Sequence, residues 1–112
     1  MDDDLNAATI RAAERERDDL RAAFAAVLSF PEGKRVLFWV LEQAAIYRDA
    51  YSGDDGATNY TLGQQSVGRK LIGMLDDIDP RTYPRLLLDI ADMKAMERAA
   101  VAQDDQEDDE DA

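Results

Sequence analysis

The stretch "YTLGQQSVGRKLIGML", residues 60–75, combines a helical apolar pattern with three glycines. Five large apolar side chains of this stretch and of the next three positions fall on one face of a helix: Val67, Leu71, Met74, Leu75 and Ile78. Each glycine costs a helix about 1 kcal/mol relative to alanine, so its presence needs a physical reason. Gly63 and Gly68 lie at the edges of this face, where a missing side chain lets another helix approach closely. We expect the same of Gly33, whereas Gly73 falls on the polar side and has no predicted role.

Similar apolar spacing predicts three further helices. One covers about 7–28, a second runs from Pro31 to about 50, and a third opens at Asp79-Pro80 and frays by about 100; the opening stretch belongs to a helix from near Thr61 to 78. The connections at 29–32 and 78–80 are short, which favours antiparallel neighbours. The stretch "SGDDGATN" at 52–59 has the composition of a loop. The predicted fold class is therefore all-α, a small three- to four-helix bundle with disordered acidic termini.

Short motifs predict how three of these helices begin. Ser29 followed by Glu32, and Thr61 followed by Gln64, have the spacing of a capping box, in which each side chain bonds a backbone N–H of the first turn. Asp79 stands where an N-cap residue would open the last helix.

The net charge of −12 is concentrated at the two ends of the chain. Residues 2–4 supply three negative charges and residues 104–111 supply seven. The stretch between these two segments contains 15 acidic and 13 basic residues, so it is nearly neutral. Blocks of like charge are typical of disordered segments. We therefore divide the chain into an acidic segment at 1–6, a helical domain at 7–100 and a disordered acidic tail at 101–112. The tail is either a solubilising appendage or a contact for a basic partner.

The residue types present argue against most enzyme chemistry. The chain has no cysteine and no histidine, which removes disulfides, zinc–thiolate sites and the commonest general base. The serines Ser29, Ser52 and Ser66 have no histidine to activate them. We expect a protein that is not an enzyme and that uses no cofactor.

Two charged clusters allow a binding role or an ordinary structural one. Asp76, Asp77 and Asp79 could hold a divalent cation, but a cap at Asp79 and two solvated carboxylates explain them as well, so we predict no metal site. Arg81 and Arg85 could touch phosphates, but the aspartates around them cancel the positive field. We therefore expect no direct contact with nucleic acid.

The longest apolar run, "VLFWVL" at 36–41, is far shorter than the roughly 20 residues of a membrane span. The first ten residues, "MDDDLNAATI", are acidic, whereas signal and transit peptides begin with basic residues. We expect a soluble intracellular protein without a membrane contact.

Phe38, Trp39 and Ile46 lie off the main apolar face of the second predicted helix. If the other helices cover only one side of that helix, these three residues form an exposed patch, which is the usual mark of an association surface. The alternative is a central helix that is buried all round. We predict a partner interface at these three residues.

Motifs from residue 30 onward resemble a family of small tailed-bacteriophage proteins typified by a Bordetella podophage protein. The matching positions are Gly33, Val36 and Leu37 in the first element, Gly63, Val67 and Gly68 in the second, and Pro80 and Tyr83 in the third. The chain departs from the family pattern by an inserted Lys34, and by Leu62 and Gln65 where relatives tend to have Glu and Arg. The family motifs carry no residue with an assignable reaction.

The resemblance implies a phage protein encoded with virion morphogenesis genes. We expect a non-enzymatic accessory protein of virion structure or assembly that docks on a phage structural or assembly protein, and the patch also allows a homo-oligomer. It would reside in the host cytoplasm during infection or associate with the virion. The alternative is a small acidic host-takeover protein whose tail binds a basic host factor.

Overall fold

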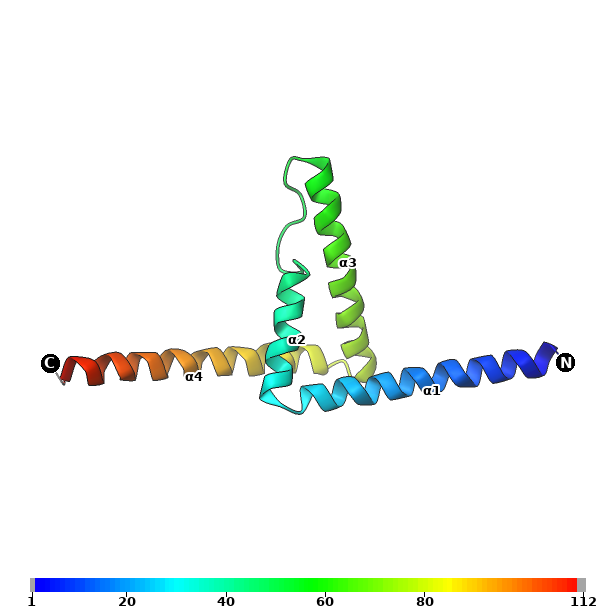
Figure 1. Cartoon of the computed structure of the whole chain (residues 1–112), viewed down its shortest axis with the longest axis horizontal. Helices are drawn as coiled ribbons and strands as arrows, with labels where there is room; N and C mark the ends of the chain where they lie inside the picture. Colours follow the sequence, from blue (N-terminus) through cyan, green and yellow to red (C-terminus); the bar gives the residue numbers. More distant parts are fainter. Residues whose placement is uncertain (1, 111–112) are drawn as a thin grey trace.

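A computed structural model describes residues 2–110, which form four α-helices and no strand. In chain order these are α1 (Asp2–Leu28), α2 (Pro31–Gln43), α3 (Asp55–Ile78) and α4 (Thr82–Glu110). Helices α2 and α3 stand side by side as an antiparallel hairpin on a base formed by the C-terminal end of α1 and the N-terminal part of α4 (Figure 1). The predicted all-α fold class is confirmed.

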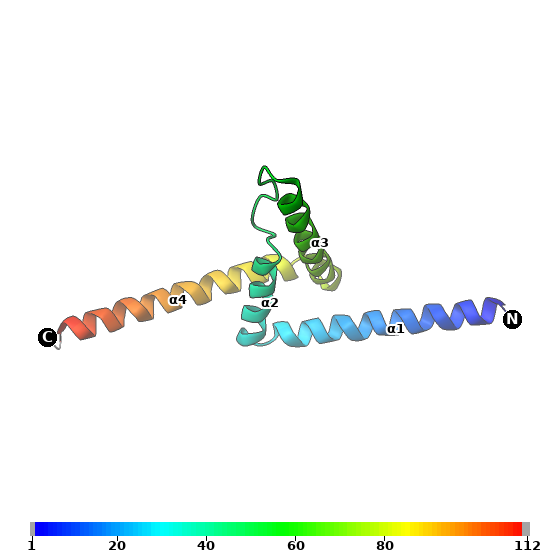
Figure 2. The same ribbon diagram turned by 45° about the horizontal axis from the view of Figure 1, so that its top comes forward.

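The molecule is far from spherical, because α1 and α4 extend from the base in opposite directions (Figures 1 and 2). Its extents are 82 × 40 × 19 Å and its radius of gyration is 20.5 Å, whereas a compact domain of this length has a radius of about 13 Å. All described side chains over residues 8–20 and 94–108 are exposed. We call the parts of α1 and α4 that carry them the two arms.

A small aliphatic core holds the hairpin to the base. It consists of Leu37, Leu41, Leu75, Leu86 and Ile90, contributed by α2, α3 and α4. Helix α1 has no buried residue and reaches this core with the half-buried Phe24 and Leu28 near its C-terminal end. Burying each large aliphatic side chain contributes about 1.5–3 kcal/mol, so a few residues supply most of the packing energy.

Helix α2 ends at Gln43, about seven residues before the predicted end. The chain turns there because Ala45 adopts a left-handed conformation with a φ of 56°. The buried Gln65 of α3 stabilises this turn: its Nε2 donates to the carbonyl of Ala45 at 2.9 Å and to that of Arg48 at 2.7 Å. The residue that departs from the family pattern at position 65 therefore has a polar structural role, which sequence alone did not reveal.

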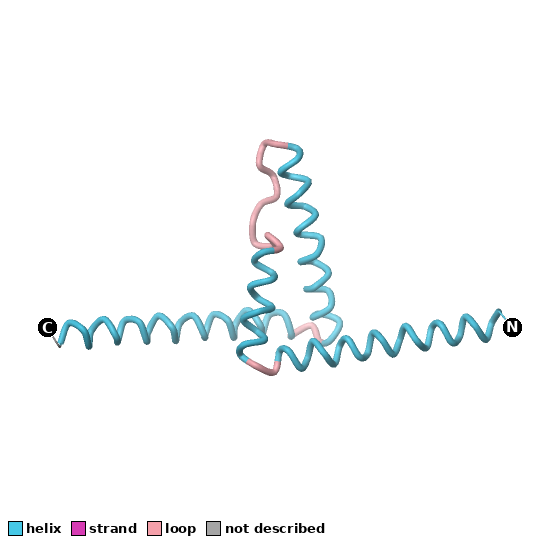
Figure 3. The backbone as a smooth tube through the Cα atoms, in the orientation of Figure 1, coloured by secondary structure: helices cyan, strands magenta, loops and turns pink. Residues whose placement is uncertain are grey.

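Both predicted capping boxes are wrong. The Ser29 hydroxyl donates back to the Ala26 carbonyl at the end of α1, and α2 begins after Phe30 without a side-chain cap. Helix α3 begins six residues before Thr61, and the Asp54 carboxylate accepts the Gly56 N–H at its N-terminus. The long connection between α2 and α3, drawn as loop in Figure 3, therefore ends earlier than predicted.

The Asp79 carboxylate lies just before α4, as predicted, where it accepts the Arg81 backbone N–H at 2.8 Å. The connections into α2 and α4 are short, but they join helices that run across each other rather than antiparallel (Figure 1). The prediction of antiparallel neighbours at these two connections is therefore wrong, and only α2 and α3 form such a pair.

The two ends of the chain differ from the predicted disorder. Helix α1 already begins at Asp2, and α4 continues through the acidic segment to Glu110; residues 1, 111 and 112 lie outside the described residues. No tertiary contact orders these ends, since their side chains are exposed as far as Asp108. Helical backbone there depends on local hydrogen bonds, and aspartates at the start of α1 interact favourably with its dipole.

The glycines that were predicted to permit close helix packing differ in their surroundings. A Cβ at Gly33 would overlap the Val27 carbonyl of α1, and one at Gly68 would lie 3.0 Å from the Ala44 Cβ. Both glycines therefore permit a close approach of another segment. Gly63 has nothing within 4 Å of such a Cβ, so its predicted role in helix packing is wrong. Gly73 has similarly open surroundings.

An ion-pair cluster joins α1 to the C-terminal end of α3. The Asp77 carboxylate accepts from the guanidinium of Arg17 at 2.6 Å and from that of Arg21 at 3.0 Å. Arg21 also donates to the Asp77 carbonyl. These hydrogen bonds, first from Arg17 and then from Arg21, hold the pKa of Asp77 well below its ordinary value. Asp77 is therefore a structural tether and not a solvated carboxylate.

Substituting the glycines tests the close approach of α1 and α2. Gly33→Ala should lower the free energy of unfolding by about 1–3 kcal/mol, because the new methyl group meets a backbone carbonyl that cannot rotate away. Gly63→Ala also replaces a flexible glycine within a helix, but its new methyl group meets no neighbour. This variant should raise the free energy of unfolding by up to about 1 kcal/mol. Urea denaturation followed by circular dichroism measures both; equal effects in the two variants would contradict the contact.

The Asp77 tether should make stability fall at acid pH. The pKa of Asp77 is lower in the folded state than in the unfolded chain. Its contribution to stability is therefore present above about pH 4 and is lost as the pH falls through the pKa of the folded state. Asp77→Asn should therefore lower the melting temperature at pH 7 and flatten its decline below pH 4. Asp76→Asn, at an exposed neighbour, should leave the melting temperature and its pH profile unchanged.

Candidate functional site

The strongest candidate site is an apolar groove between α2 and α4, which we call the α2–α4 groove. It has a volume of about 370 Å³ and is lined by Arg35, Val36, Phe38, Trp39, Glu42, Ile90, Met93, Lys94 and Glu97. Val36 and Trp39 are 61% and 59% exposed, although both are large apolar residues. The buried Ile90 and half-buried Met93 form the α4 side of the groove. The groove thus presents apolar surface that no other part of residues 2–108 covers.

Charged side chains at the rim of the groove connect the two helices. Arg35 of α2 forms an ion pair with Glu97 of α4. The Lys94 ammonium lies 4.7 Å from the centre of the Phe38 ring, the geometry of a cation–π interaction. These contacts fix the width of the groove, because each joins a residue of α2 to a residue of α4.

Two of the three residues predicted as an interface, Phe38 and Trp39, line the groove, whereas Ile46 does not. Trp39 lies in the groove and is exposed. Phe38 is half-buried, packs against the core and lies 5.8 Å from Tyr47 between ring centres. Ile46 packs against the core near Gly68, because α2 has already ended and the turn at Ala45 directs the chain inward. Positions 39 and 46 would share a helical face only if α2 continued to about residue 50, as the sequence predicted.

Sequence reasoning missed that Trp39 and Val36 of α2 share a groove with Met93 of α4. Helical periodicity puts Met93 on the apolar face of the last predicted helix, and Val36 at the margin of the apolar face of the second. Neither pattern shows that these two faces meet. The signal that could have found the groove is the apolar face of α4, which continues past the core from Ile90 to Val101.

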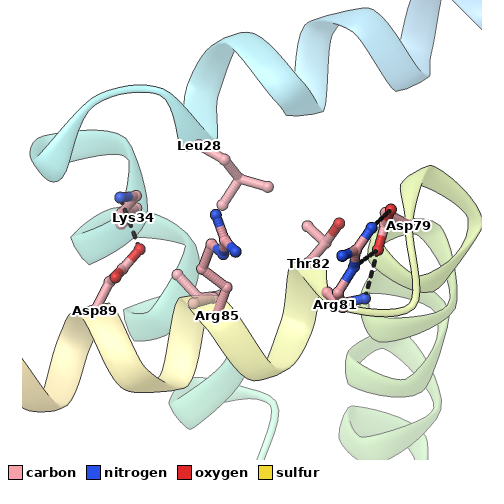
Figure 4. A pocket seen from close by; sticks show the side chains of 8 residues that line it. Leu28, Lys34, Asp79, Arg81, Thr82, Arg85 and Asp89 are labelled. Atoms are coloured by element: carbon pink, nitrogen blue, oxygen red, sulfur yellow. Dashed lines mark hydrogen bonds and ion pairs between the residues drawn. The ribbon is translucent and has the colours of Figure 1, made fainter.

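A second cavity, of about 470 Å³, lies where α1 ends and α2 and α4 begin (Figure 4). The Lys34 ammonium bonds the Asp89 carboxylate at 2.8 Å, and the Arg81 side chain bonds Asp79 at 3.2 Å. Arg85 extends between these pairs toward Leu28. Since carboxylates accompany two of the three cations, the cavity lacks the concentrated positive charge of an anion site.

The aspartates considered as metal ligands point to other partners. Asp77 binds the two arginines of α1, and Asp79 binds Arg81. Within residues 2–110, no group of three or more acidic side chains is arranged to hold a metal ion. In the same described part of the chain, no helix is both long and apolar enough to cross a membrane.

Another family motif residue links the hairpin to α4. The hydroxyls of Tyr83 and Tyr47 are 2.8 Å apart and share a hydrogen bond. Burial, followed by this bond to Tyr83, raises the pKa of Tyr47 above its ordinary value. The hydrogen bond therefore attaches the segment that follows α2 to α4.

The fold and the groove together define a small, elongated helical protein with an exposed apolar surface between two of its helices. Comparison with protein families matches residues 24–88 to the family described as Bbp19-like phage protein. The chain belongs to this family, which confirms the resemblance that the motifs indicated. The match covers the core except Ile90, and the α2 side of the groove, whereas both arms lie outside it. No curated protein and no solved structure matches the chain.

The exposure of Trp39 can be tested by its effect on stability. Trp39→Ala should lower the free energy of unfolding by about 1 kcal/mol or less, because the side chain is largely in water. Leu41→Ala, two positions along the same helix at a fully buried site, should cost about 2–5 kcal/mol. Thermal or urea unfolding compares the two; a larger loss at Trp39 than at Leu41 would place the tryptophan in the core.

Proposed function

We propose that the chain is a non-enzymatic accessory protein of phage virion structure or assembly, which acts by docking on another protein of the particle. The supporting observation is the exposed Trp39 in an apolar groove of a chain that belongs to a phage protein family. Exposed tryptophans in apolar clefts are typical of contact surfaces, since such side chains contribute strongly to binding once covered. On this proposal the protein resides in the host cytoplasm during infection and on assembly intermediates or particles.

The groove suits a docking role better than a chemical one. Three of the four charged side chains that line it, Arg35, Glu97 and Lys94, are already engaged with residues of the same chain. They are therefore poorly placed to transfer protons to a substrate. The apolar walls, in contrast, gain free energy from any partner that removes them from water.

Particles and assembly intermediates can be purified from cells that produce the phage, and the protein in them quantified by mass spectrometry. We expect it to co-purify with a capsid, portal or other assembly protein. Trp39→Ala should reduce this association about tenfold or more, the loss typical of a hot-spot residue. Tyr60→Ala removes an exposed aromatic of α3 outside the groove and should leave the association unchanged.

The proposal would be abandoned if particles and intermediates lack the protein and no capsid or portal protein co-purifies with it. A chain that lacks residues 104–112 distinguishes the host-takeover alternative. Loss of binding to a host protein by this truncated chain, with particle assembly unimpaired, would favour that alternative.

A further inference from the structure

The chain exposes more surface than its mass requires. Its accessible surface is 8532 Å², whereas a compact monomer of 12.5 kDa exposes about 6,200 Å². A standard protein interface takes about 800 Å² from each partner. The excess of about 2,300 Å² is therefore sufficient for such an interface, and it comes from the arms on either side of the core.

The α2–α4 groove continues along the C-terminal arm. A shallow hollow lined by Lys94, Glu97, Arg98 and Val101 adjoins the groove and shares two of its residues. Val101 is 60% exposed. At 100° per residue, Ile90, Glu97 and Val101 fall on the same face of α4. The apolar surface that begins at Trp39 thus extends onto the arm.

Beyond Val101 this face becomes acidic. Asp104 and Asp108 follow at three and seven positions, so they continue the same stripe, with Asp105 at its edge. All three side chains are exposed, and residues 101–108 include no lysine or arginine. One continuous surface is therefore apolar at the hairpin and negatively charged at the outer end of α4.

We propose that this surface binds a basic amphipathic segment of a second protein, which lies along α4 with its apolar residues against Trp39 and Met93 and its lysines or arginines against Asp104 and Asp108. The inference depends on the docking function proposed above and adds the chemistry of the partner. With a rise of 1.5 Å per residue, Asp104 and Asp108 lie about 16–22 Å along the helix from Met93. The segment therefore carries its basic residues three to four helical turns from its apolar ones.

The negative charge of the surface argues against a second copy of the chain and against nucleic acid as the partner. A second copy of the chain would have to supply a basic segment, but its two ends are acidic and its middle carries 15 acidic against 13 basic residues. Nucleic acid would meet Asp104, Asp105 and Asp108 with phosphates of the same sign. A basic protein segment matches both the apolar and the acidic part.

Photo-cross-linking in cells that produce the phage tests this arrangement on the full chain. A photoreactive amino acid is placed at position 36, in the groove, or at position 105, on the arm, which leaves Trp39, Asp104 and Asp108 intact. We expect both positions to attach to the same partner protein, position 36 beside large apolar residues and position 105 beside lysines or arginines. Mass spectrometry of the cross-linked peptides identifies the two segments.

Charge variants provide a matched control. Asp104→Asn combined with Asp108→Asn should reduce the cross-link at position 36 about two- to tenfold, the loss that two exposed ion pairs produce. Asp92→Asn combined with Glu107→Gln removes the same charge from other sides of α4 and should leave the yield unchanged. Equal reductions by the two double variants would overturn the inference.

The remaining outcomes separate this inference from the proposed function. A partner captured at position 36, with no cross-link or no basic segment at position 105, would overturn the inference and leave docking intact. Cross-links from both positions to a second copy of the chain would also overturn it. Absence of any partner protein at both positions would overturn the inference and the proposed docking together.

Discussion

Burial of a few leucines where the hairpin meets the base is the constraint on which the rest of the structure depends. Leu41, Leu75 and Leu86 come from three different helices and are almost completely removed from water. Because this core is small, the packing around it has little redundancy, and Gly33 and Gly68 are needed where segments approach most closely. The arms extend from this junction and receive no stabilisation from it beyond their first turns.

Polar contacts compensate for the small core by fixing the directions in which the helices leave it. The Asp77 carboxylate with its two arginines orients α1, and the Tyr47–Tyr83 hydrogen bond attaches the hairpin to α4. Gln65 satisfies two carbonyls of the turn after α2. Each contact joins residues far apart in sequence, so together they convert a few packed side chains into a defined arrangement of four helices.

The α2–α4 groove is a consequence of this geometry. Helix α4 crosses the hairpin instead of packing along it, so α2 is covered on one side only and Trp39 remains in water on the other. The surface available for association therefore results from the same crossing that builds the core.

The sequence by itself determined the helical class, because apolar residues at three- and four-residue intervals fix the periodicity of each segment. It also contains the motif positions of the family. For Trp39 it left two alternatives, an exposed or a buried side chain, of which the structure shows the exposed one. It failed at the end of α2 and at Ile46, because the turn at Ala45 depends on hydrogen bonds from Gln65, which lies 20 residues further along the chain. Only the tertiary structure decided how the helices cross and that Val36, Trp39 and Met93 share a groove. Helical periodicity specifies which face of each helix is apolar, whereas which faces meet depends on contacts between helices that no single stretch of sequence contains.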